Sequence, residues 1–150
     1  MERKKKLLDQ FAKAHKFDGL PPLANKILGV FYLSDEKYLS FETLTEFLDS
    51  SKGAVSKMLK ILIAVRRVNF IQDPTSKRKR LFYLDSKGAE EYVNLVVEGL
   101  MEQRSLMLQL SAYRTSESDK EIDDLIERTL AFNQQIVTAL QKNNKKYYKK

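Results

Sequence analysis

Apolar residues recur every three or four positions along the N-terminal part of the chain, which is the spacing of an amphipathic helix. A first such segment runs from Glu2 to Phe17, begins with several lysines and stops at Asp18-Gly19. After Pro21-Pro22, which presets the start of a helix, a more strongly apolar helix is predicted up to about Leu33. The pattern therefore predicts two helices joined by a rigid corner.

Two further helical patterns follow, separated by a turn at Asp49–Ser51. The first opens at Ser40, and the second runs from Ser51 to about Val65. Each serine is a natural N-cap, because its hydroxyl oxygen can accept a hydrogen bond from a free backbone N–H of the first turn. In the second helix the apolar residues share one face and the polar ones the opposite face: the apolar set is Val55, Met58, Leu59 and Leu62, and the polar set is Ser56, Lys57 and Lys60.

The pattern then changes to short β-leaning runs, at Val68–Gln72 and Leu81–Leu84. They flank the polar segment Asp73–Arg80, which has the composition of a long hairpin turn. Two helices followed by a hairpin are the outline of a winged helix-turn-helix. The hairpin turn would then be the wing.

The C-terminal part predicts two long helices, from Ser86 to about Ala112 and from about Ser118 to Lys142. Both are apolar on more than one side, and a small domain offers few neighbours to cover them, so we expect a partner chain. The predicted fold class is mainly α (α+β), a winged helix-turn-helix domain with N- and C-terminal helices that form a dimerisation region. The expected divisions are an N-terminal dimerisation helix (1–18), the winged helix-turn-helix domain (19–85), C-terminal dimerisation helices (86–142) and a flexible basic tail (143–150).

Composition narrows the function classes. The 150 residues include no cysteine and one histidine, His15, which argues against thiol chemistry and a strong transition-metal site. Neighbouring carboxylates such as Asp123 and Asp124 point apart on a helix, and there is no Gly-rich phosphate loop or nucleophile motif. No run approaches the roughly 20 apolar residues of a membrane span. We therefore expect a cytoplasmic protein that is not an enzyme, with no cofactor, metal or membrane partner.

Positive charge is concentrated in the winged-helix outline. Residues 52–80 hold nine Lys or Arg against the single acid Asp73, a net charge of +8, whereas the whole chain carries +7. The other residues therefore sum to −1. A local basic patch of this kind points first to phosphate.

The residues of this patch suit duplex DNA. The second helix of a helix-turn-helix enters the major groove, where serines and lysines bond phosphates or base edges and a glycine lets the backbone approach closely. A cationic wing turn lies along the backbone or inserts an arginine into the minor groove, and Arg78 and Arg80 are equal candidates for that role. The predicted DNA-binding residues are Ser51, Lys52, Gly53, Ser56, Lys57, Lys60, Lys77, Arg78, Lys79 and Arg80.

The motif GLPPLANKILGVFYLSD, followed by LSFETLTEFLDSSKGAVSKMLKIL, resembles the MarR-type winged helix-turn-helix transcriptional regulators, and particularly their GbsR-like branch. The resemblance covers roughly Gly19 to Leu84. It implies a homodimeric DNA-binding regulator whose recognition helix is Ser51–Val65 and whose wing is Asp73–Arg80. The chain departs from the family pattern at the turn, which has Asp49 and Ser50, and at Arg66, where a glycine usually ends the recognition helix.

The leading hypothesis is a sequence-specific double-stranded DNA-binding transcriptional regulator that acts as a homodimer. The alternative is a winged-helix protein-interaction module whose basic face binds an acidic partner. Single-stranded RNA binding comes third, because aromatic platforms are few. A small-molecule effector is a further hypothesis, with Tyr32, Tyr38, Tyr92 and Tyr113 as candidate lining residues.

Overall fold

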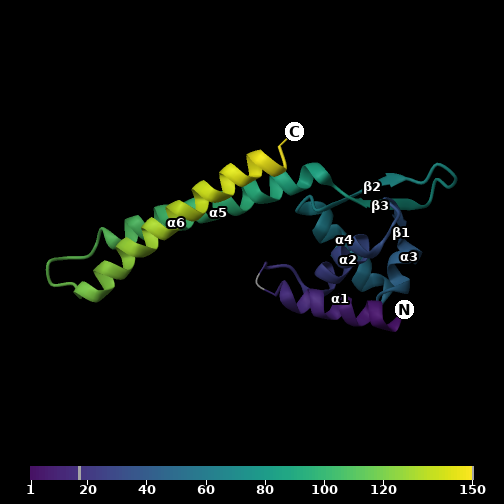
Figure 1. The fold of residues 1–150 in the computed structure, drawn as a ribbon, viewed down its shortest axis with the longest axis horizontal. Coiled ribbons are helices and arrows are strands. Elements are labelled where there is room, and N and C mark those ends of the chain that lie inside the picture. Colours follow the sequence, from purple (N-terminus) through teal and green to yellow (C-terminus); the bar gives the residue numbers. More distant parts are fainter. Residues whose placement is uncertain (17, 150) are drawn as a thin grey trace. The chain divides into compact units, whose positions relative to one another are not determined.

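A computed structural model describes residues 1–16 and 18–149 of the chain, which form two compact units, one up to Gly88 and one from Ala89 onward. The first unit holds four helices, a three-stranded sheet and the first residues of a fifth helix, and the second is a helical hairpin (Figure 1). The elements are α1 (Glu2–Ala14), α2 (Pro22–Leu33), β1 (Leu39–Ser40), α3 (Phe41–Glu46), α4 (Lys52–Ala64), β2 (Val68–Gln72), β3 (Arg80–Leu84), α5 (Ser86–Ser111) and α6 (Lys120–Tyr147).

Helices α1 and α2 pack against each other beside Gly29. A Cβ built there would lie 2.6 Å from Cδ2 of Leu8, so a larger residue would require the buried Leu8 side chain to shift. The corner between them is fixed by Asp18, whose Oδ1 accepts hydrogen bonds from the Leu20 N–H at 2.9 Å and from Nδ2 of the buried Asn25 at 3.2 Å. Helix α1 ends at Ala14, earlier than expected, and the predicted helical end at Phe17 lies outside the described residues.

The helix-turn-helix forms as predicted. Ser40 caps α3, its Oγ accepting the Thr43 N–H at 3.1 Å, and Ser51 caps α4, its Oγ accepting the Ala54 N–H at 3.1 Å. The predicted apolar face of α4 is confirmed, since Val55, Leu59 and Leu62 are buried and Met58 packs against the same cluster. That cluster is the core of the first unit; its other members include Ile27, Leu28, Val30, Leu44, Val68 and Phe82.

The sheet has the antiparallel order β1-β3-β2. Strands β2 and β3 pair from Val68 opposite Leu84 to Gln72 opposite Arg80, as the predicted hairpin requires. The sequence did not reveal β1, a two-residue strand whose Leu39 pairs with Phe82. Figure 1 shows the β2–β3 hairpin extending beyond the helices, with its turn at the tip. With α3 and α4, this sheet completes the winged-helix fold.

Helix α4 ends in a tight left-handed turn at Arg66, which has a φ of 61°. The Arg67 N–H donates to the Leu62 carbonyl at 2.9 Å and the Arg66 N–H to the Ile63 carbonyl at 3.0 Å, the paired bonds of a Schellman motif. The helix therefore ends where predicted although the residue is not glycine. A non-glycine residue in this conformation costs about 1–2 kcal/mol.

The chain returns to the same point after the hairpin. The Asp85 N–H donates to the Arg67 carbonyl at 3.2 Å, and the Asp85 carboxylate caps α5 by accepting the Lys87 N–H at 3.0 Å. The next residue, Gly88, is buried against Arg66: a Cβ built on it would overlap the Arg66 carbonyl oxygen and lie 3.3 Å from the Arg66 Cβ. Only glycine lets α5 begin this close to the end of α4.

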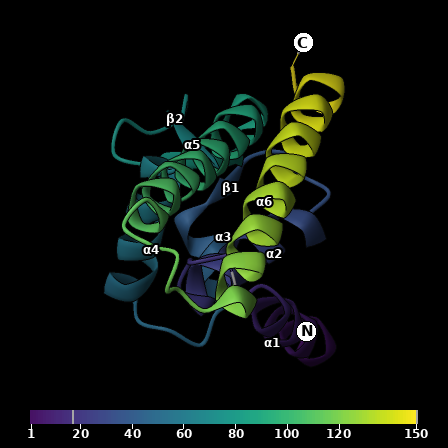
Figure 2. The ribbon, with the colours of Figure 1, turned by 90° about the vertical axis from the view of Figure 1, so that its left-hand side faces the viewer.

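In the second unit, side chains on each helix bond the main chain of the other. Figure 2 looks from the side of the loop that joins α5 and α6. Arg104 Nη1 donates to the Leu130 carbonyl at 2.5 Å, Asn133 Nδ2 to the Leu100 carbonyl at 3.2 Å, and Asn144 Nδ2 to the Glu90 carbonyl at 3.2 Å. These three bonds are spaced along the hairpin and hold the two helices in one antiparallel register.

Helix α6 is longer than expected. It continues to Tyr147, so the prediction that periodic structure stops at Lys142 is wrong for residues 143–147. The reason is Asn144, a polar residue that the sequence pattern placed in the tail. It is buried against α5, where it bonds Glu90 and also donates to Asn94 Oδ1 at 3.1 Å.

Much of the apolar surface of α5 and α6 is exposed to solvent. Among the residues that the structure describes from Ala89 onward, Val97 and Val137 are the buried hydrophobic side chains, whereas Leu110 is 72% exposed and Phe132 68%. Other exposed members are Leu95, Val96, Met101, Leu106, Leu108, Ile122, Leu125 and Ile136. Within residues 1–16 and 18–149, no helix has the length and apolar content needed to cross a membrane.

The contact at Gly88 gives a stability prediction. Gly88→Ala is expected to destabilise the protein by about 3 kcal/mol, the upper end of the cost of overpacking, because the new methyl group meets backbone atoms that cannot move independently. Gly99→Ala is the matched control in the same helix, where a Cβ meets nothing within 4 Å. That change is expected to stabilise by about 0.5–1 kcal/mol. Thermal unfolding followed by circular dichroism measures both; equal effects of the two changes would contradict the packing role of Gly88.

Candidate nucleic-acid interface

The exposed face of α4 carries the predicted major-groove residues. Lys52, Gly53, Lys57 and Lys60 are exposed, Ser56 is half-buried, and the hydroxyl of exposed Ser51 already serves as the N-cap. A Cβ built on Gly53 meets no atom within 4 Å, so the fold itself does not require glycine at this position. The first turn of α4 thus presents backbone N–H groups and cations on an unobstructed surface.

The wing tip, residues 73–79, consists of two consecutive β-turns. The Ser76 N–H donates to the Asp73 carbonyl at 3.1 Å, and the Lys79 N–H to the Ser76 carbonyl at 3.3 Å. The Asp73 N–H closes the pair of turns by donating to the Lys79 carbonyl at 2.9 Å. Pro74 stands second in the first turn, where its fixed φ is favourable, and Lys77 and Arg78 are the two central residues of the second turn.

The side chain of Gln72 lies under these turns. Its Nε2 donates to the carbonyl oxygens of Ser76 at 3.1 Å and Lys79 at 2.9 Å, and it also contacts the Lys77 carbonyl. Three main-chain acceptors therefore converge on one side-chain amide. Sequence reasoning missed this residue, because a glutamine at the end of a strand carries no pattern that shows which carbonyl groups its side chain will bond.

Asp73 braces the first turn. Its Oδ1 accepts hydrogen bonds from the Thr75 N–H at 2.9 Å and the Thr75 hydroxyl at 2.8 Å. These bonds, the backbone one first, lower the pKa of the Asp73 carboxyl below its ordinary value of 3.8. Their contribution to the turn is therefore present above the unfolded-state pKa and is lost as the pH falls through the lowered one.

The two wing arginines have different surroundings. Arg80 pairs with Gln72 in the sheet and shares the face of Phe82, which is buried. Its guanidinium carbon lies 4.4 Å from the centre of the Phe70 ring, a cation–π contact, and the Phe70 and Phe82 rings are 6.1 Å apart. Arg78 stands exposed at the tip.

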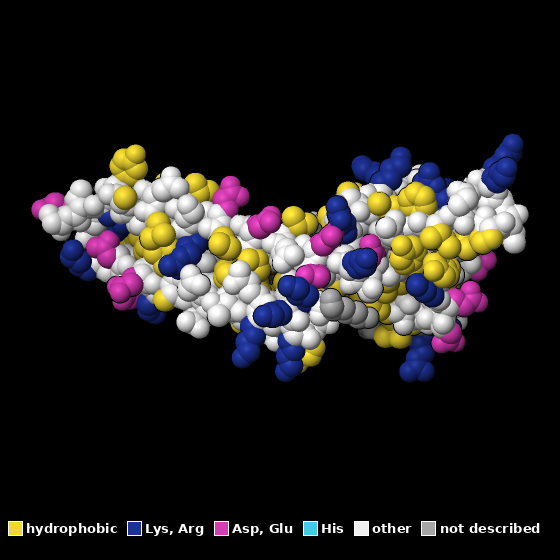
Figure 3. Space-filling view, turned by 90° about the horizontal axis from the view of Figure 1, so that it is seen from above, with side chains coloured by type: hydrophobic (Ala, Val, Ile, Leu, Met, Phe, Trp, Pro, Cys, Tyr) yellow, Lys and Arg dark blue, Asp and Glu magenta, His cyan; other side chains and the backbone are white. Residues whose placement is uncertain are grey.

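The cationic residues of α4 and of the wing tip belong to one unit of the structure. Lys77, Arg78, Lys79 and Arg80 are all exposed, as are the three lysines of α4. Figure 3 shows Lys and Arg side chains (dark blue) gathered at the upper edge of the right-hand part of the view. The structure thus places most predicted site residues at the surface of the same winged-helix unit.

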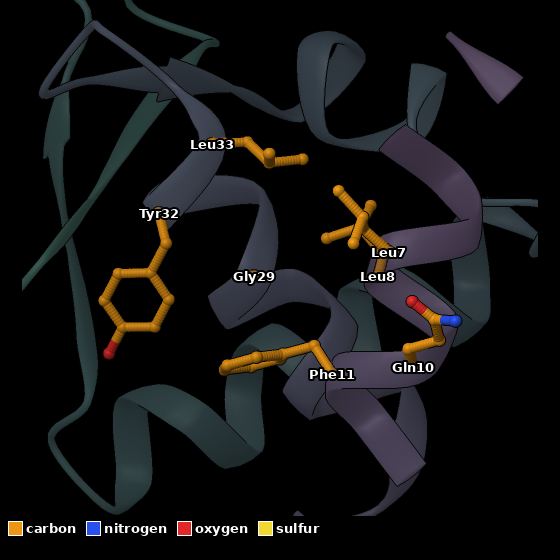
Figure 4. A pocket seen from close by; sticks show the side chains of 7 residues that line it. All are labelled: Leu7, Leu8, Gln10, Phe11, Gly29, Tyr32 and Leu33. Carbon is orange, nitrogen blue, oxygen red and sulfur yellow. The ribbon is translucent and has the colours of Figure 1, made fainter. Parts of the chain in front are cut away.

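A separate hollow of about 400 Å³ lies between α1 and α2 and bears on the effector hypothesis. Figure 4 shows the rings of Phe11 and Tyr32 and three leucine side chains around Gly29. Of the four candidate tyrosines, Tyr32 lines this hollow, whereas Tyr38 packs against the Tyr83 ring with a centroid distance of 5.6 Å and Tyr113 is 87% exposed. Across the described part of the chain, no group of three or more potential metal ligands occurs.

No protein-family model matches the chain, and no curated protein matches it. The chain is similar to the crystal structure of a transcriptional regulator, with a TM-score of 0.66, 17% sequence identity and 99% of each chain covered. Apo wild-type MarR from E. coli has a TM-score of 0.44 and 21% identity, with 86% of this chain and 89% of that chain covered. The PcaV transcriptional regulator from Streptomyces coelicolor has a TM-score of 0.45 and 15% identity, with 89% and 94% covered. The first of these likenesses supports the fold assigned from the topology.

Proposed function

We propose that the protein is a sequence-specific double-stranded DNA-binding transcriptional regulator of the MarR type, GbsR-like branch, that acts as a homodimer. The observation that carries this proposal is a winged-helix unit whose exposed α4 face and wing hold seven cations. They are Lys52, Lys57, Lys60, Lys77, Arg78, Lys79 and Arg80. The whole-chain likeness to a protein described as a transcriptional regulator agrees with it.

In this proposal α4 enters the major groove. Its N-terminal residues approach phosphates and base edges, as in other helix-turn-helix proteins. Lys57 and Lys60 lie opposite the buried face of α4, so their side chains can contact DNA while the core stays intact. That face consists of Val55, Leu59 and Leu62. The wing meets the flanking minor groove or backbone.

The exposed apolar surface of α5 and α6 supports the proposed homodimer. Large side chains such as Leu110 and Phe132 are more than two-thirds exposed in the single chain. Exposed large apolar side chains concentrated on two helices favour a protein interface. Two copies would place two α4 helices on half-sites about one DNA turn apart, roughly 34 Å.

A first prediction concerns the salt dependence of DNA binding. Each phosphate that a cation neutralises contributes about 0.9 to the slope of log affinity against log salt. Replacing Lys57 and Lys60 by Ala removes four cations from a dimer and is expected to reduce the slope by up to about 3.6. Binding to a duplex recovered by in vitro selection, measured by fluorescence anisotropy at several salt concentrations, gives the slope.

The control is Lys6→Ala with Lys13→Ala, which removes the same charge from exposed positions of α1. It is expected to leave the slope close to that of the wild type. If the Lys57 and Lys60 change leaves DNA binding untouched while the dimer is intact, the protein-interaction module becomes the better reading.

A second prediction separates function from stability at Gly53. Gly53→Ala is expected to stabilise α4 by up to about 1 kcal/mol, because glycine is a poor helix former and the added Cβ meets nothing. The same change is expected to weaken DNA binding about tenfold, or roughly 1.4 kcal/mol, by holding the backbone away from a phosphate. Thermal unfolding and anisotropy measure the two effects, and a variant that is more stable and binds equally well would exclude the backbone contact.

A third prediction distinguishes the wing arginines. Arg80 is held on the Phe70 ring, so Arg78 is the proposed minor-groove residue. Narrow A-tract grooves favour arginine because of their enhanced negative potential. Arg78→Lys is expected to reduce the preference for an A-tract over a G·C-rich flank about tenfold, within the range for one specific arginine contact. Arg80→Lys is expected to weaken binding to both duplexes alike; the reverse pattern would assign the groove to Arg80.

A further inference from the structure

The side-chain amide of Gln72 contacts an unusual number of carbonyl groups for one side chain on an exposed hairpin. Its Nε2 faces the carbonyl oxygens of Ser76 and Lys79 at 3.1 and 2.9 Å, and that of Lys77 in addition. A carboxamide nitrogen has two hydrogens, so three acceptors saturate it. The carbonyl dipoles of both wing turns consequently point at the same partial positive charge.

This arrangement controls where the wing cations point. Because the carbonyls of Ser76, Lys77 and Lys79 turn inward to Gln72, the backbone of the second turn has one fixed face. The exposed side chains of Lys77 and Arg78 leave from the central positions of that turn. Without the amide, the Lys77 carbonyl would lose this donor, and the carbonyls of Ser76 and Lys79 would keep only the weaker hold of the turn bonds from the Lys79 and Asp73 N–H groups.

We infer that Gln72 is a positioning residue for DNA binding, which orders the wing tip so that Lys77 and Arg78 are presented in one arrangement before DNA arrives. This inference rests on the proposed function and names a residue that carries no charge and acts through the side chains of Lys77 and Arg78. Preorganisation of this kind raises affinity because little ordering of the loop remains to be done on binding.

Two substitutions of similar shape test the inference. Gln72→Met keeps the length of the side chain but removes the donors. Gln72→Glu presents an acceptor to three acceptors and is expected to open the tip further. Both leave the nine basic residues of the 52–80 segment in place.

The first measurement is amide hydrogen exchange by NMR without DNA. In both variants the Asp73 and Lys79 amides, which close the two turns, are expected to lose at least tenfold of their protection. The Phe82 amide, which lies on the central strand β3 opposite Leu39 of β1, is expected to keep its protection. Unchanged protection of Asp73 and Lys79 would overturn the inference whether or not the protein binds DNA.

The second measurement is DNA affinity as a function of pH. Gln72→Met is expected to bind about tenfold more weakly than wild type at every pH. Gln72→Glu is expected to bind more weakly still at pH 8 and to recover relative to wild type as the pH falls and the carboxyl regains a proton to donate. Ile71→Glu, which adds the same charge at the adjacent exposed strand position, controls for simple repulsion of DNA and is expected to lack the exchange defect.

The outcomes distinguish a failure of the proposed DNA-binding function from a failure of the positioning role of Gln72. Wild-type protein that fails to bind any duplex would refute the proposed function, while the exchange result would still decide whether Gln72 orders the wing tip. Loss of exchange protection with undiminished DNA binding in Gln72→Met would refute the positioning role and leave the proposed function standing.

Discussion

The left-handed turn at Arg66 is the constraint on which the winged-helix unit depends. It ends α4 and releases the chain into β2, and the chain comes back to the same place when β3 ends, where the Asp85 N–H bonds the Arg67 carbonyl. Gly88 then lets α5 begin against the Arg66 carbonyl. The end of α4, both ends of the β2–β3 hairpin and the first residues of α5 therefore share one junction, so the direction of the wing relative to α4 is set by a few backbone hydrogen bonds.

The wing is likewise held in one conformation by a small number of hydrogen bonds. Its turns are held by main-chain bonds, by Asp73 and by Gln72, while Arg80 is kept against Phe70. Neutral and acidic groups, Gln72 and Asp73, thus hold the backbone of the turns from which the exposed cations of the tip extend. The cations of the wing gain direction in this way, because charge alone would attract phosphate from any side.

Periodicity was sufficient to predict the two caps, the apolar face of α4 and the paired strands, because each depends on neighbours within a few residues. It failed where a long-range contact decides the outcome. Strand β1 is only two residues long and exists through its pairing with β3. Asn144 extends α6 through a bond to α5, and Arg66 takes a glycine conformation because the junction around it requires one. The different surroundings of Arg78 and Arg80 could not be predicted for the same reason, since they depend on a ring from the opposite strand.

The bonds that set the register of α5 and α6 treat the two partners unequally. Asn133, Asn144 and Arg104 contribute their side chains, whereas Leu100, Glu90 and Leu130 contribute only carbonyl oxygens. Any residue that the helix tolerates supplies the same carbonyl oxygen. The register therefore restricts the residue type at Asn133, Asn144 and Arg104 and leaves it free at the three carbonyl positions. Most of the outward surface of both helices can change in sequence while the hairpin keeps its alignment.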